Sequence, residues 1–206
     1  MVSAAPPAPA RAPVLGDRLD AAFFARPVAE VAPALVGCTL LVDGVGGVIV
    51  EVERYQQDDP ASHSFRGPVG RAGVMFGAPG RLYVYRSYGL HWCLNLVCEP
   101  EGRGAAVLVR ALAPTRGLEA MRARRGGLAD RLLCAGPGRL CAALGVDGRL
   151  DGATAVGPGA AAWLGARTGP VEIATGPRIG ITKAADRPWR FGLAGSPYLS
   201  RPFPRA

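Results

Sequence analysis

The sequence has almost no lysine. Of its 24 basic residues only Lys183 is a lysine, and the other 23 are arginines. Histidine is nearly as scarce, with two residues, and the five cysteines are odd in number and form no CxxC pair. This pattern argues against a structural zinc site and favours reduced, mostly buried thiols. No apolar run approaches the roughly 18 to 20 residues of a membrane-spanning helix, and the N-terminus lacks the pattern of a secretion signal.

Glycine and proline are abundant instead, with 29 and 19 residues among 206. This content indicates that much of the sequence forms turns and loops. The hydrophobic fraction of 49% nevertheless excludes a wholly disordered chain and is enough for a real core. Residues 1–14 are rich in Pro and Ala and predict a disordered tail. Residues 15–206 contain no clear linker or repeat, and their length favours one domain.

The formal net charge of +8 and the isoelectric point near 9.8 favour a partner with negative charge. Nucleic acid, an anionic membrane and a phosphorylated ligand all fit this surplus. A basic protein without any polyanionic partner fits the composition as well.

Short β-like runs outnumber helical segments. Helices are expected over residues 17–34, 115–125 with Thr115 as N-cap, and 137–144. Strands are expected over residues 38–42, 47–55, 82–85, 92–97, 106–111, 171–174, 178–181 and 189–193. Because successive strands are separated mostly by short turns, the pattern predicts an α+β fold, a single domain with a mainly antiparallel sheet flanked by helices.

One strand carries a candidate acid/base pair. In the run IVEVERY, strand alternation places Glu51, Glu53 and Tyr55 on one face and Arg54 on the other. Neighbouring carboxylates that are partly buried suit acid/base chemistry, whereas a solvated strand face would carry the same residues. The loop that follows delivers His63, ten residues after Glu53.

A second candidate element is the hairpin RLYVYRSYGLHWCLNLV. Its alternation places Tyr83 and Tyr85 on one face, and Gly89 permits a tight turn that leaves Tyr88 exposed at the tip. Such an aromatic tip in a basic protein is a candidate wedge between nucleic-acid bases. Ordinary sheet packing explains tyrosines in a hairpin equally well.

The run LCAGPGRLCAALG predicts a helix that begins after a Gly-Pro-Gly turn and ends at Gly145. The free amides at its N-terminus, helped by Arg139, could hold a phosphate, but a plain helix start has the same sequence.

Taken in order, these segments resemble the alkyladenine (3-methyladenine) DNA glycosylases, a family of base-excision repair enzymes. The resemblance covers about residues 15–201 and is carried by six blocks: IVEVERY, DDPASHSFRG, MFGAPGRLYVYRSYGLHWCLN, VLVRALAPTRGLEAMR, LCAGPGRLCAALG and RFGLAGSPYLS. It implies a curved antiparallel sheet with a protruding hairpin, as in the C-terminal domain of methionyl-tRNA formyltransferase.

The resemblance also implies roles for individual residues. Glu53 matches the general base that activates water, and Arg110 matches its partner, with the backbone carbonyl of Ile179 as a further water ligand. Tyr88 matches the residue that intercalates into the minor groove. The residues that match the binding site of the flipped base are Tyr55, His63, Tyr85 and Asn95, the last of which disfavours guanine.

The implied reaction is hydrolysis of the N-glycosidic bond of an alkylated or deaminated purine in duplex DNA. No cofactor and no metal is expected, and a lyase step would need an amine, for which the chain offers only Lys183 and its N-terminus. The protein is expected to be a cytoplasmic monomer with no membrane partner, and nucleoid-associated if prokaryotic. A non-catalytic nucleic-acid-binding domain of the same fold is the alternative, and a helix-hairpin-helix glycosylase is a weaker one.

Three features depart from the family pattern. Arg54 stands where the family usually has Ala, and the loop between Glu53 and His63 is one residue shorter than usual. Residues 69–72 replace a typical Thr-Pro-Arg-Asn. Arg54 is expected to point away from the catalytic face, whereas the shorter loop is expected to shift His63.

Overall fold

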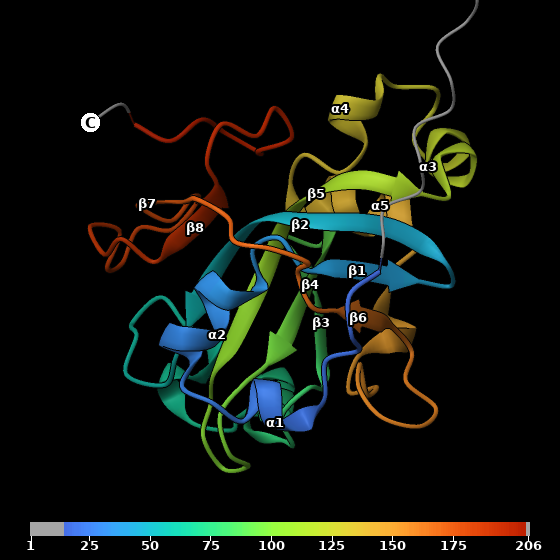
Figure 1. The fold of residues 1–206 in the computed structure, drawn as a ribbon. Helices are drawn as coiled ribbons and strands as arrows, with labels where there is room; N and C mark the ends of the chain where they lie inside the picture. Colours follow the sequence, from blue (N-terminus) through green and yellow to red (C-terminus); the bar gives the residue numbers. More distant parts are fainter. Residues whose placement is uncertain (1–14, 205–206) are drawn as a thin grey trace, which may run out of the picture.

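A curved antiparallel sheet organises the protein, as the computed structural model in Figure 1 shows for residues 15–204. The strands run in the order β3-β4-β5-β2-β1-β6, and β8 joins β2 and carries β7 at its other edge. Their bounds are β1 Thr39–Val42, β2 Val45–Tyr55, β3 Leu82–Ser87, β4 His91–Val97, β5 Ala106–Arg116, β6 Trp163–Gly165, β7 Ile173–Gly176 and β8 Arg190–Leu193. The predicted α+β class is therefore confirmed, and the predicted tail over residues 1–14 lies outside the described residues.

Helices cover the sheet in two groups (Figure 1). The α-helices are α1 Ala21–Phe24, α2 Val28–Leu35, α3 Leu118–Arg124, α4 Asp130–Leu133 and α5 Pro137–Leu144, and the 3-10 helices are η1 His63–Arg66, η2 Gly70–Phe76 and η3 Gly148–Leu150. The predicted helix over residues 137–144 is confirmed. The one predicted over residues 17–34 is split in two because Pro27 lacks an N–H and disfavours helical backbone at the residue before it.

Two further expectations were wrong. Thr115 is not a helix cap, because β5 continues through it to Arg116 in register with β2, and α3 begins only after the left-handed Gly117. Residues 178–181 do not form a strand: the backbone is irregular there, and Gly180 has a φ of 77°. The short elements α4 and β6 were not predicted.

The register of the sheet aligns residues that are far apart in the sequence. Tyr83 pairs with Asn95, Asn95 with Leu108, and Leu108 with Glu53. Directly paired residues share a face, so this row crosses four strands on one side of the sheet. The pairing of β2 with β5 shifts twice beside this row, which leaves Val50 and Arg110 each as an extra residue on its own strand. Such bulges re-aim side chains.

The other side of the sheet packs into the main core. Leu35 of α2, Val52 of β2, Leu94 of β4 and Leu140 of α5 are all fully buried there. The five cysteines are buried and unpaired, as expected. Within residues 15–204, none of the helices has the length and apolar character needed to span a bilayer. The main core thus lies on one side of the sheet, and the row of Tyr83, Asn95, Leu108 and Glu53 lies on the opposite side.

Candidate active site

A cleft of about 500 Å³ opens on the side of the sheet that carries the row of paired residues. Its floor comes from β4 and β5, and its sides come from β2, β3, η1, η2 and the irregular segment after β7. The lining residues used below are Tyr55, His63, Arg71, Tyr83, Tyr85, Tyr88, Cys93, Asn95, Leu108, Arg110 and Ile179.

Aromatic rings form two sides of the cleft. His63 and Tyr85 touch edge to face, with 4.6 Å between their ring centroids, and His63 Nδ1 lies 2.7 Å from the hydroxyl of Tyr83. Tyr55 comes from β2, which is separated from β3 by the two floor strands. The curved sheet therefore places Tyr55 on one side and the His63–Tyr85 pair on the other. Aromatic side chains of this kind suit the binding of a flat, apolar ring.

Burial changes the titration of these rings. It raises the pKa of the Tyr83 hydroxyl to about 12. It also lowers the pKa of His63, and the nearby Arg71 guanidinium lowers it further. The Tyr83 hydroxyl is therefore neutral at physiological pH, and the neutral form of His63 is favoured.

Asn95 and Leu108 form part of the floor. The Asn95 side chain is almost fully buried, and its amide nitrogen donates to the carbonyl of Tyr83 at 2.9 Å. This bond orients the amide group, so any contact with a ligand has a fixed geometry.

Glu53 lies just beneath the floor, with none of its surface exposed. Its Oε1 accepts a hydrogen bond from the Ile179 backbone amide at 2.7 Å, and its Oε2 accepts one from the Tyr55 hydroxyl at 2.8 Å. Arg110 Nη1 lies 3.2 Å from the same Oε2. All three partners line the cleft, so the carboxylate lies directly behind the wall of the cleft.

Glu51 is also fully buried but has different partners. Its carboxylate accepts from Arg110 Nε at 3.2 Å, from Arg190 Nε at 2.7 Å, and from the backbone and side chain of Ser200. Burial alone would lower the pKa of Arg110, but the carboxylates of Glu53 and Glu51 outweigh it and raise that pKa. Arg110 is therefore a permanent cation that bridges the two glutamates.

The β3–β4 hairpin carries the most exposed aromatic side chain among residues 15–204. Tyr88 is 89% exposed and has a φ of 50° at the turn, where Gly89 follows with a φ of 67° and Leu90 N–H closes the turn on the Ser87 carbonyl. A positive φ is strained for tyrosine. This strain and exposure, at the rim of the cleft, are typical of a side chain that acts on a partner.

The structure thus brings the seven residues singled out from the sequence to one place. Six line the cleft, and Glu53 lies directly beneath it. Sequence reasoning did not assign a role to Tyr83, to Arg178 or to the Ile179 amide. The Ile179 carbonyl as a water ligand stays a prediction. The turn residues Pro177 and Gly180 around Ile179 were the available sign that this segment is a loop.

Comparison with known proteins identifies the family. A family model described as methylpurine-DNA glycosylase matches residues 22–197. Two relatives named "Putative 3-methyladenine DNA glycosylase" are 59% and 60% identical to the chain: that of Nitrobacter winogradskyi over 93% of this chain and 91% of its own, and that of Rhodopseudomonas palustris strain HaA2 over 92% and 93%. A relative of the same name from Nitrosospira multiformis is 58% identical over 87% of this chain and 92% of its own.

The chain belongs to the methylpurine-DNA glycosylase family. The resemblance seen in the sequence is therefore confirmed. As a DNA glycosylase of this family, the protein acts on DNA and takes part in DNA repair.

The departures from the family pattern have structural explanations. Arg54 stacks on Trp189, with 4.1 Å between its guanidinium carbon and the ring centroid, and it does not line the cleft. The short loop before His63 is anchored by the buried Asp59, which forms an ion pair with Arg178. Residues 69–72 fall at the start of η2, where Arg71 extends over the Tyr85 ring at 5.2 Å.

Proposed function

We propose that this glycosylase excises alkylated or deaminated purines, 3-methyladenine among them, from duplex DNA, and that Glu53 activates the attacking water. The observation that carries the proposal is the buried Glu53–Arg110 pair directly beneath a cleft with aromatic sides. The 3-methyladenine in the names of the relatives supports the substrate class.

The damaged nucleotide must leave the base stack to reach this cleft. A cleft of about 500 Å³ accommodates one purine, and a purine inside a duplex is inaccessible to a buried carboxylate. We infer that Tyr88 fills the vacated space in the duplex, while the base lies between Tyr55 and the His63–Tyr85 pair. A damaged purine is extruded more easily because it is weakly paired, and Asn95 disfavours unmodified guanine.

Hydrolysis then needs a water, a base and stabilisation of a positively charged sugar. A carboxylate accepts about four hydrogen bonds. Glu53 receives two, and its ion pair with Arg110 lies at Oε2, which leaves a position on Oε1 for a water. The water oxygen bonds to C1′ of the sugar, its proton passes to Glu53, and the N-glycosidic bond breaks with its electron pair on the departing purine. The Glu53 carboxylate also stabilises the oxocarbenium-like transition state.

A simple hydrolase, with no lyase step, fits the amines of the chain. Lys183 is exposed and does not line the cleft, so no lysine is placed to form a Schiff base with the sugar. A single chain supplies all the cleft residues, and we propose that the enzyme acts as a monomer. Its arginines would contact phosphates and make DNA affinity fall as salt rises.

The test is a panel of duplexes, each with one lesion: 3-methyladenine, 7-methylguanine, hypoxanthine or ethenoadenine. Abasic sites are scored after alkaline cleavage, for the wild-type protein and for Glu53→Gln. We expect the wild type to excise at least one lesion and the variant to bind the same duplex without excising it. Binding of lesion duplexes without excision by the wild type would instead indicate a non-catalytic binding domain.

A further inference from the structure

Arg178 has the most completely enclosed guanidinium near the cleft, with none of its side chain exposed. It pairs with both carboxylate oxygens of Asp59, which is itself fully buried, and donates to the carbonyls of Arg54 at 3.1 Å and Ala184 at 3.4 Å. Burying two charges is costly unless they are paired, so removing only one partner of this pair would be destabilising.

The same guanidinium lies against Tyr55. Its central carbon is 4.6 Å from the centroid of the ring. Tyr55 lines the cleft and Arg178 does not, so the cation covers a side of the ring that is turned away from the cleft. Burial and then the Glu53 carboxylate raise the pKa of the Tyr55 hydroxyl, and the Arg178 charge opposes that rise.

Arg178 also connects the two sides of the cleft. Asp59 accepts a hydrogen bond from the Ala61 amide at 3.1 Å, and its carbonyl accepts one from Ser62 at 2.9 Å. Ser62 in turn caps η1, the helix that begins with His63. The residue after Arg178 is Ile179, whose amide holds Glu53. One side chain therefore sits between Tyr55, the loop that positions His63, and the segment that orients the carboxylate.

A cation on one side of an aromatic ring changes what the ring attracts on the other side. The face of a ring attracts cations through its quadrupole. A positive charge already bound to the ring repels a second one, and it does so strongly in a buried environment where screening is weak. A neutral base suffers no such repulsion.

We propose that Arg178 is a positioning and specificity-determining residue, which fixes the spacing between Tyr55 and His63 and reduces the preference of the cleft for cationic over neutral purine lesions. This inference rests on the proposed function, because it takes Tyr55 and His63 as contacts of the flipped base. It assigns to a residue outside the cleft an effect on which lesions enter it.

The experiment measures single-turnover excision of 7-methylguanine, which is cationic, and of hypoxanthine, which is neutral, in duplexes of one sequence. The readout is the rate for 7-methylguanine divided by the rate for hypoxanthine. In the double variant Arg178→Gln with Asp59→Asn both charges are removed and a hydrogen-bonded pair remains, so the ratio should rise about threefold as the cation behind Tyr55 is lost. Asp59→Asn alone leaves that cation without its counter-charge, so the ratio should fall below that of the wild type.

Arg178→Lys separates positioning from charge. Lysine keeps the positive charge but cannot hold both oxygens of Asp59 and two carbonyls in a planar fork. Both excision rates should therefore fall by about tenfold because the reacting groups are misplaced, while their ratio stays at the wild-type value. Arg187→Gln is the matched control: Arg187 stacks on Trp189 at 4.5 Å and is 4.0 Å from Asp59, but it is partly exposed. It should change neither rate nor ratio.

An unchanged ratio in both Asp59 variants would overturn the specificity role, and wild-type rates in Arg178→Lys would overturn the positioning role. These results leave the proposed function intact, since the wild type still excises both lesions. A wild type that excises neither lesion, nor any other of the lesion panel, would instead refute the proposed function.

Discussion

Glu51 and Glu53 lie two residues apart on β2, both fully buried and both in contact with Arg110. Four donors reach Glu51, about as many as a carboxylate accepts, and two of them come from Ser200 near the end of the chain. Glu53 accepts two hydrogen bonds and forms an ion pair with Arg110, and all three partners line the cleft. The two identical side chains on one strand face thus differ in the number and the origin of the donors that reach their oxygens.

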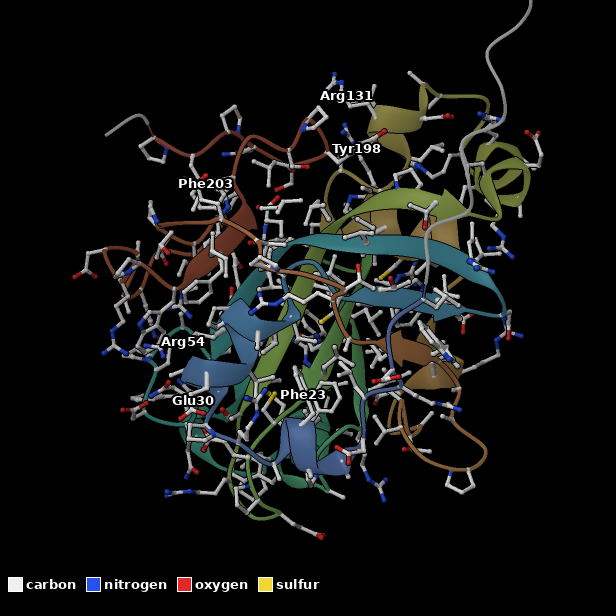
Figure 2. The ribbon with its side chains drawn as sticks, viewed as in Figure 1. Phe23, Glu30, Arg54, Arg131, Tyr198 and Phe203 are labelled. Carbon is white, nitrogen blue, oxygen red and sulfur yellow. The ribbon has the colours of Figure 1, made fainter. Side chains whose placement is uncertain are left out.

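The C-terminal segment produces this saturation. Arg190 of β8 stacks on Phe203, with 4.0 Å between its guanidinium carbon and the ring centroid, and donates to the carbonyl of Arg201. Figure 2 shows Phe203 beside β8. A Cβ added to Gly192 would clash with the Phe203 ring, so the segment packs closely on β8. The chain end thus closes over Glu51 and leaves Glu53 on the side of the cleft.

The largest expected effect is the loss of excision in Glu53→Gln. Removing a general base typically lowers a rate by about 10² to 10⁴, so single-turnover excision should fall within that range while the Kd for lesion DNA stays the same. Glu51→Gln is the matched control, with the same chemical change two residues away, and it should keep excision within about tenfold of the wild type. Equal losses in the two variants would contradict the division of roles.

In stability, the two variants should rank in the opposite order, with the larger loss in Glu51→Gln. Glu51→Gln leaves the buried Arg190 and Arg110 with one anion fewer, and breaking a buried ion pair costs about 3 kcal/mol or more of unfolding free energy. Urea unfolding should show this loss in Glu51→Gln and a smaller one in Glu53→Gln, because Glu53 has a single arginine partner. If Glu53→Gln were less stable than Glu51→Gln, the contacts of Glu53 would contribute more to stability than those of Glu51.

Tyr55→Phe tests how the free acceptor position of Glu53 is defined. The variant keeps the ring but removes the hydroxyl that donates to Oε2, so the carboxylate is less well oriented. We expect excision to fall by about tenfold, in line with the loss of one hydrogen bond to a charged group, while DNA affinity is retained. A loss of affinity that equals the loss of rate would assign the effect to base stacking.

The smallest effect is expected for Ser200→Ala, which removes one of the four donors to Glu51. The free energy of unfolding should fall by about 1 kcal/mol, as measured by urea denaturation, and excision should match that of the wild type. A change in excision without a change in stability would show that the C-terminal segment acts on the reaction itself.

The sequence predicted most of the sheet correctly, because strand alternation and turn residues are local signals. It also predicted that Glu51 and Glu53 share a face, and both do contact Arg110. It could not predict the bulge at Arg110, which depends on the pairing of β2 with β5. The prediction of a strand over residues 178–181 was wrong. Ile179 and Ile181 are β-branched and favour a strand, but Pro177 and Gly180 interrupt the pattern.

The sequence by itself determined the fold class, the family and which residues are candidates for chemistry, because these follow from periodicity and from ordered motifs. Only the tertiary structure decided which glutamate is saturated, which side of Tyr55 carries Arg178, and how the loop before His63 is anchored. These features join residues more than a hundred positions apart, such as Asp59 with Arg178 and Glu51 with Ser200. Contacts over that separation are set by packing and register, which no local pattern records.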